Sequence, residues 1–225
     1  MRNATLFKIY IAFSAVYLLI LFLGHENLNF FLKPILIPIL IFGVYFYQNF
    51  PTKNILLTAL LFSWIGDVIL LFSDISEIYF ILGLVSFLIS HIVYCILFNR
   101  QAKRNLKKNS IAIGIGSILI ACYLIGMLSV LLPSLGDLKI PVIVYASVIS
   151  IMLLFAYNGL LSWNEPGNKL VFSGAVVFVI SDSILAINKF YNPIEKSSFF
   201  IMLTYLVAQY LIVIGILKLN PKKVE

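Results

Sequence analysis

The sequence has few charged residues, few cysteines and few histidines. Charged residues make up 11% of its 225 residues, far below the roughly 25% that is usual in soluble domains. The two cysteines, Cys95 and Cys122, fall inside apolar runs without metal-ligand spacing, so we expect neither a disulfide nor a cysteine site. Two histidines are too few for a zinc hydrolase with three histidine ligands. This composition excludes a soluble domain. We expect no bound metal and no cofactor, and one metal ion held by His91, Asp67 and Asp182 is the alternative.

Hydrophobic residues dominate instead. They make up 62% of the chain, and the mean hydropathy is +1.06. A helical span needs about 20 mostly apolar residues, so a chain of this length with short connections holds about eight spans. The sequence predicts an all-α integral membrane protein, a bundle of eight transmembrane helices that forms a single polytopic domain over residues 1–225. The predicted spans are 5–23, 30–47, 55–72, 78–98, 110–132, 140–161, 169–188 and 198–219.

The basic residues predict the orientation of these spans. When Lys and Arg are assigned to alternate sides of the membrane, 12 of the 16 fall on the side that carries both termini. Cytoplasmic loops carry an excess of Lys and Arg, so both termini are predicted to be cytoplasmic. Because the net charge of +7 follows this topology, we expect no nucleic-acid partner. The 12 residues are Arg2, Lys8, Lys53, Arg100, Lys103, Arg104, Lys107, Lys108, Lys169, Lys218, Lys222 and Lys223.

Two acids lie in the middle of apolar runs. The segment IGDVIL at 65–70 places Asp67 there, and ISDSIL at 180–185 repeats the phrase around Asp182. A carboxylate in hydrocarbon costs several kcal/mol unless it is neutralised, paired or hydrated, so acids inside a membrane are functional candidates. If the repeated phrase reflects a duplication, the chain consists of two four-helix halves related by an axis along the membrane normal.

Asp67 and Asp182 are therefore the predicted catalytic residues. Two buried carboxyls that lie close together tend to share one proton, which supplies one general acid and one base. The residues around Asp67 are apolar, whereas two serines flank Asp182. Because apolar surroundings favour the protonated form of a carboxyl group, this difference favours Asp67 as the acid. In the alternative interpretation, each acid only links neighbouring helices or pairs with Lys33 or another cation.

Other polar side chains within the spans are candidates for the same pocket. Each also has a structural explanation: membrane serines often pack helices or bond their own backbone, a lysine can extend to the interface, and a buried histidine is often only a hydrogen-bonding residue. The predicted substrate-binding residues are Lys33, Ser63, His91, Tyr94, Tyr145, Ser181 and Gln209.

Several of these residues stand in motifs that resemble the YhhN family, which includes the animal transmembrane lysoplasmalogenases. The resemblance covers nearly the whole chain and keeps the order of the motifs. The motifs are KP at 33–34, LLFSWIGDVILL at 60–71, GLVSFLISHIVY at 83–94, GAVVFVISDSILAI at 174–187 and YLVAQYLIVIG at 205–215.

The resemblance implies an ether hydrolase that cleaves the vinyl ether bond of lysoplasmalogen, a lysophospholipid. The products are a fatty aldehyde and glycerophosphocholine or glycerophosphoethanolamine. It implies that Asp67 and Asp182 are catalytic, and it places Lys33, His91 and Gln209 in the same pocket. A protonated Asp could protonate the vinyl ether, and an ionised one could stabilise the resulting cation. We expect the protein in a bacterial cytoplasmic (inner) membrane.

Two other classes of function fit the same residues. Two acids near the middle of a repeated bundle could couple a carrier to protons or cations. A lipid-binding membrane protein without turnover would use both acids only as contacts between helices. The sequence leaves the oligomeric state open.

Overall fold

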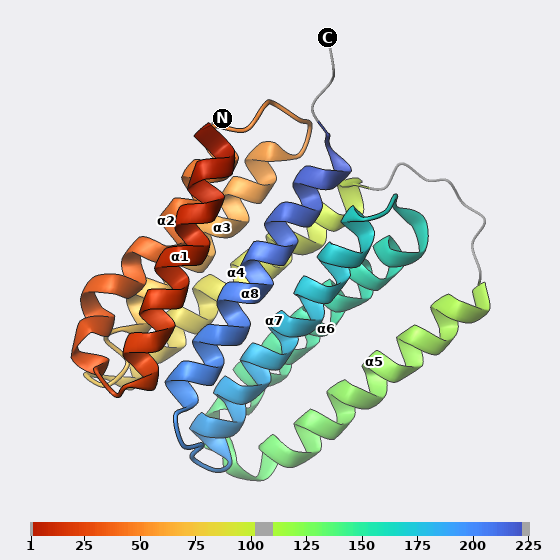
Figure 1. The fold of residues 1–225 in the computed structure, drawn as a ribbon. Coiled ribbons are helices and arrows are strands. Elements are labelled where there is room, and N and C mark those ends of the chain that lie inside the picture. Colours follow the sequence, from red (N-terminus) through yellow and green to blue (C-terminus); the bar gives the residue numbers. More distant parts are fainter. Residues whose placement is uncertain (1, 102–109, 222–225) are drawn as a thin grey trace. The chain divides into compact units, whose positions relative to one another are not determined.

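The computed structural model describes residues 2–101 and 110–221, which contain eight α-helices and no strand. Each predicted span corresponds to one helix whose ends lie within a few residues of the predicted ends (Figure 1). The all-α prediction is therefore confirmed. The helices are α1 (Arg2–Phe22), α2 (Asn29–Tyr45), α3 (Lys53–Leu70), α4 (Glu77–Gln101), α5 (Ser110–Leu131), α6 (Lys139–Ser162), α7 (Gly167–Phe190) and α8 (Ser197–Leu219).

The chain divides into two compact units. One contains α1 to α4 as far as Leu97, and the other begins at Phe98 and contains α5 to α8. The boundary lies within the last turn of α4, so the first unit holds α1 to most of α4 and the second holds α5 to α8. That these units are duplicated halves stays a prediction. That both units belong to a single domain over residues 1–225 stays a prediction.

Seven of the eight helices in the described residues are long and apolar enough to cross a membrane. The exception is α2, which is apolar but has only 17 residues. At about 1.5 Å per residue it is about 26 Å long, somewhat less than the roughly 30 Å of a bilayer core. An integral membrane protein is therefore supported, while the count of eight spans and the orientation of the termini stay predictions.

Small residues bring α3 and α4 of the first unit together. A Cβ on Gly66 would lie 2.7 Å from the ring of Phe87 and 3.3 Å from the carbonyl oxygen of Gly83. The Ser86 hydroxyl donates to the Phe62 carbonyl of α3 at 2.6 Å. Small residues and serine hydroxyls are typical of helix contacts in membranes, where close approach of backbones replaces the hydrophobic effect.

Lys53 ties α2 to α3 where the chain turns between them. Its Nζ donates to the carbonyl oxygens of Tyr45 at 2.8 Å and Tyr47 at 2.7 Å, and to Oδ1 of Asn49 at 3.2 Å. The last carbonyls of a helix lack intrahelical donors and carry partial negative charge, so an ammonium there is stabilising. This contact fixes one end of the α2–α3 hairpin.

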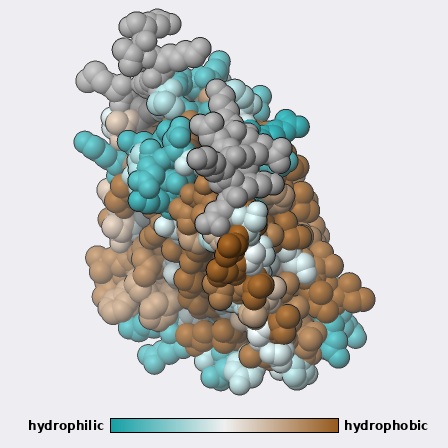
Figure 2. Space-filling model, turned by 90° about the vertical axis from the view of Figure 1, so that its right-hand side faces the viewer, coloured by the Kyte–Doolittle hydropathy of each residue, from teal (hydrophilic) through white to brown (hydrophobic). Residues whose placement is uncertain are grey.

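In the second unit, α5 stands at the edge beside α6 and α7 (Figure 1). Only Gly116 and Leu131 of this helix are buried among the residues described, although Tyr157 of α6 donates a hydrogen bond to the Ala112 carbonyl at 2.8 Å. Figure 2 faces the side on which α5 lies and shows hydrophobic residues in a band between hydrophilic ones. Such a surface suits contact with lipid. Its large exposed side chains on α5 include Ile111, Ile115, Ile118, Leu119 and Ile125.

Candidate functional site

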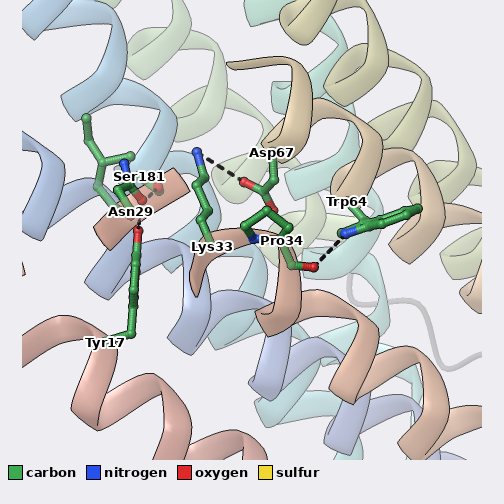
Figure 3. A network of polar contacts seen from close by, with 8 residues as sticks. Tyr17, Asn29, Lys33, Pro34, Trp64, Asp67 and Ser181 are labelled. Atoms are coloured by element: carbon green, nitrogen blue, oxygen red, sulfur yellow. Dashed lines mark hydrogen bonds and ion pairs between the residues drawn. The ribbon is translucent and has the colours of Figure 1, made fainter. Parts of the chain in front are cut away.

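Asp67 of α3 forms an ion pair with Lys33 of α2. The Lys33 Nζ lies 3.5 Å from Oδ1 of Asp67, and the side chains are 11% and 3% exposed (Figure 3). An ammonium at this distance stabilises the carboxylate form and offsets part of the cost of burying both charges. Pairing with Lys33 was the alternative interpretation of the sequence, and the structure has this pair. The same end of α2 also contacts α1, because the Tyr17 hydroxyl donates to Oδ1 of Asn29 at 2.6 Å.

A second contact joins the two helices beside this ion pair. In an α-helix the N–H of residue 38 would bond the carbonyl of residue 34, but Pro38 has no N–H. The indole Nε1 of Trp64 donates to this Pro34 carbonyl instead, at 2.8 Å (Figure 3). Trp64 and Asp67 lie three residues apart on α3 and so share a face. Sequence reasoning did not assign Trp64 to the site, although two prolines four residues apart were a signal.

Asp182 of α7 has a different environment. The Tyr145 hydroxyl of α6 donates to Oδ2 of Asp182 at 2.5 Å, and Asp182 is half-buried. The sequence predicted that Tyr145 binds substrate; in the structure its hydroxyl holds the acid. A short hydrogen bond of this kind fixes the orientation of the carboxyl group.

Ser183 follows Asp182 in the sequence, and its hydroxyl bonds the hydroxyl of Tyr123. Ser183 donates to the Val179 carbonyl at 2.5 Å, and its oxygen lies 2.5 Å from the hydroxyl of Tyr123 on α5. Because Ser183 has a single hydroxyl hydrogen, Tyr123 is the donor in the second bond. Sequence reasoning did not find Tyr123, since nothing in the local sequence of α5 marks it.

The two serines predicted to bind substrate make contacts between helices. Ser63 lies 2.8 Å from the hydroxyl of Ser90 on α4, and Ser90 in turn donates to the Ala59 carbonyl at 2.8 Å. Ser181 donates to the Ile201 carbonyl of α8 at 2.9 Å. Such contacts are expected if the two serines serve to pack helices together. A role of Ser63 and Ser181 in binding substrate stays a prediction.

The remaining predicted residues are buried in their units. His91 and Tyr94 on α4 are 1% and 0% exposed, and Gln209 on α8 is 0% exposed. Their assignment to a substrate pocket stays a prediction. Within residues 2–101 and 110–221, no three His, Cys, Asp or Glu side chains form a group that could hold a metal ion.

The two acids are therefore equipped for different chemistry. The carboxyl group of Asp67 lies 3.5 Å from the ammonium group of Lys33. Asp182 accepts a hydrogen bond from the Tyr145 hydroxyl, a group that can pass on a proton. Carboxyls whose environments differ in this way are suited to separate acid and anion roles.

Comparison with known proteins gives the family. The model of the YhhN family matches residues 28–216. Lysoplasmalogenase TMEM86A of Homo sapiens is 32% identical over 184 residues, which cover 77% of this chain and 69% of the relative. The protein of the same name from Bos taurus is 30% identical over 181 residues, with the same coverage. No solved structure matches. Since the family match includes every helix from α2 to most of α8, the chain belongs to the YhhN family.

Proposed function

We propose that this protein is a lysoplasmalogenase-like membrane hydrolase. It cleaves the vinyl ether bond of lysoplasmalogens and releases a fatty aldehyde and glycerophosphocholine or glycerophosphoethanolamine. The observation that carries this proposal is the 32% identity to a protein named lysoplasmalogenase over 69% of its length. Asp67, which is buried, and Asp182, which is half-buried, support it, because the reaction needs acid catalysis.

The chemistry of a vinyl ether explains the need for an acid. The bond resists bases and nucleophiles, but protonation of the outer alkene carbon converts it to an oxocarbenium ion. Water then adds to the carbon that bears the oxygen and loses a proton, giving a hemiacetal. The hemiacetal collapses to the aldehyde and the free glycerol hydroxyl. A proton donor and an anion that stabilises the cation supply these steps, as paired carboxyls do in glycoside hydrolysis.

We assign the acid role to Asp182 and the anion role to Asp67. Lys33 at 3.5 Å favours the charged form of Asp67, whereas Asp182 accepts a hydrogen bond from the Tyr145 hydroxyl, which can return a proton to it. This reverses the assignment that the apolar neighbours of Asp67 favoured in the sequence. The sequence argument considered only residues on the same helix, while Lys33 comes from α2.

The test is aldehyde release by detergent-purified protein from choline and ethanolamine lysoplasmalogens. Asp67→Asn and Asp182→Asn are each expected to lower turnover by about 10²- to 10⁴-fold, the usual effect of removing an acid or base. Asp137→Asn, at an exposed acid in the turn between α5 and α6, is the control and is expected to retain activity. No aldehyde from well-folded protein would reject the hydrolase and favour a carrier or a lipid-binding protein.

The division of roles has its own test. A general acid acts only in its protonated form, so the residual turnover of Asp67→Asn, which keeps Asp182, is expected to retain the pH dependence of the wild type. Asp182→Asn is expected to lose it. Equal behaviour of the two variants would contradict the assignment.

A further inference from the structure

The α2–α3 hairpin is joined by side chains at both ends. Lys53 binds the end of α2 near the turn. At the other end, Trp64 bonds the Pro34 carbonyl and Asp67 pairs with Lys33. The contacts run in opposite directions along the two helices, as antiparallel neighbours require. Two consecutive residues of α2 are thus engaged by two residues on one face of α3.

Trp64 has a second role besides packing, because it donates a hydrogen bond to the Pro34 carbonyl. A backbone carbonyl in apolar surroundings needs a donor, and Pro38 removes the donor that the helix would supply. Trp64 supplies one at 2.8 Å. An indole has a single N–H in a fixed direction, so the bond sets the position of α2 along α3. A lysine side chain is flexible by comparison, and 3.5 Å is a distance that a small shift of α2 would lengthen.

We propose that Trp64 is a positioning residue for Asp67. Its bond to the Pro34 carbonyl holds α2 against α3 so that Lys33 stays within ion-pair distance of the Asp67 carboxylate. Trp64 does not touch the substrate; it acts through Lys33 and Asp67. The infrared test below is independent of the proposed hydrolase, while the kinetic test rests on it.

A membrane tryptophan often has a simpler explanation, namely anchoring at the lipid–water interface. The geometry argues against anchoring as the whole role of Trp64, because its N–H donates to a backbone carbonyl of the protein. The other tryptophan of the chain offers the comparison. Trp163 is also buried, and its Nε1 has no hydrogen-bond partner within the residues that the structure describes.

The first test compares Trp64→Phe with Trp163→Phe by infrared spectroscopy. The carboxylate band of Asp67 is isolated as the difference between each protein and its Asp67→Asn counterpart. Trp64→Phe is expected to shift or broaden this band, because Lys33 no longer stays at a fixed distance. Trp163→Phe is expected to leave it unchanged. An Asp67 band that is the same in Trp64→Phe and in the wild type would overturn the proposal.

The second test measures turnover. Trp64→Phe is expected to lower kcat about tenfold with little change in KM, as the loss of one oriented hydrogen bond suggests. In the Asp67→Asn background the same substitution is expected to have no further effect. A tenfold loss that persists without Asp67 would show a general structural defect and overturn the positioning role.

Pro38→Ala provides a variant that restores the missing donor. Its N–H can bond the Pro34 carbonyl within α2, so the effect of Trp64→Phe on both the band and kcat is expected to shrink in this background. An unchanged effect would contradict the role of the free carbonyl. If the wild type releases no aldehyde, the proposed function fails, while the infrared comparison still decides the role of Trp64.

Discussion

Lys33 or Asp67 alone would lower the stability of an apolar bundle, because burying a single charge costs free energy. Removing one partner of a buried pair leaves an uncompensated charge, whereas removing both often costs little. The exposed fractions of 11% and 3% place this pair among buried pairs. Its effect on stability can therefore be separated from its effect on turnover.

We predict that Lys33→Met destabilises the protein by about 3–5 kcal/mol, because it leaves the Asp67 carboxylate buried without its cation. The double variant Lys33→Met/Asp67→Asn is expected to recover most of this loss. Unfolding in detergent would measure both. The control is Lys169→Met, which removes a pair with Glu165 whose side chains are 63% and 64% exposed, and which is expected to cost less than about 1 kcal/mol. A double variant less stable than Lys33→Met would contradict the pairing.

We predict that Tyr145→Phe lowers aldehyde release by up to about tenfold, because the hydrogen bond that orients the Asp182 carboxyl group contributes about 0.5–1.5 kcal/mol. The ring remains, so packing is retained. Tyr157→Phe is the control, since its hydroxyl bonds a backbone carbonyl of α5 rather than an acid. Steady-state kinetics would measure the difference. Equal losses in both variants would show that the hydroxyl acts only through folding.

Sequence reasoning identified Asp67, Asp182, Lys33 and Tyr145, but it gave a pair with Lys33 only as an alternative and did not pair Tyr145 with Asp182. Each pairing joins neighbouring helices, and it depends on the position of one helix along the axis of the other. The local pattern of apolar and polar residues does not specify this relative position of the two helices. Ser63, which does share a face with Asp67, instead bonds α4.

At the scale of the helices, close approach through glycine holds α7 against α8. A Cβ on Gly174 would lie 2.9 Å from the backbone nitrogen of Ile212 and 3.0 Å from the carbonyl oxygen of Ala208. Backbone atoms cannot move aside as the end of a side chain can. The spacing of the two helices is therefore set by the absence of a side chain at this position.

We predict that Gly174→Ala destabilises the protein by about 1–3 kcal/mol, the usual cost of overpacking. Gly114→Ala on α5 is the matched control, because a Cβ there would meet nothing within 4 Å. This control is expected to be neutral or to stabilise by up to about 1 kcal/mol, since Ala favours helix over Gly. Thermal unfolding in detergent would compare them, and equal shifts would contradict the close contact.

The helices themselves could be predicted because hydrophobic runs and turn residues define them. The predicted span 55–72 corresponds to α3, which ends two residues earlier at Leu70, where turn structure begins. The span 30–47 corresponds to α2, which ends at Tyr45. Its carbonyls there are bonded by Lys53 from beyond the turn. The composition of the sequence does not predict this contact between Lys53 and the end of α2.

At the scale of the whole molecule, the open question is whether α2 crosses the membrane. Its 17 residues are short for a span, but the predicted topology, with 12 of 16 Lys and Arg on one side, assumes that it crosses. If it does, the turns before and after it face opposite sides. These turns contain the exposed residues Asn27 and Pro51.

We predict that a cysteine introduced by Asn27→Cys reacts with a membrane-impermeant thiol reagent from outside the cell, whereas Pro51→Cys reacts only after the membrane is opened. Both changes would be made in a Cys95→Ala/Cys122→Ala background, and labelling would be measured in intact and permeabilised cells. Reaction of both from the same side would reject the eight-span topology.

The two prolines of α2 have a consequence for how the chain enters the bilayer. On its own, α2 would carry a lysine and a carbonyl without a donor into hydrocarbon. Its partners Trp64, Asp67 and Lys53 all belong to α3 and are synthesised later. We therefore expect α2 to be retained at the translocon until α3 emerges, so that the two helices partition into lipid together as one hairpin.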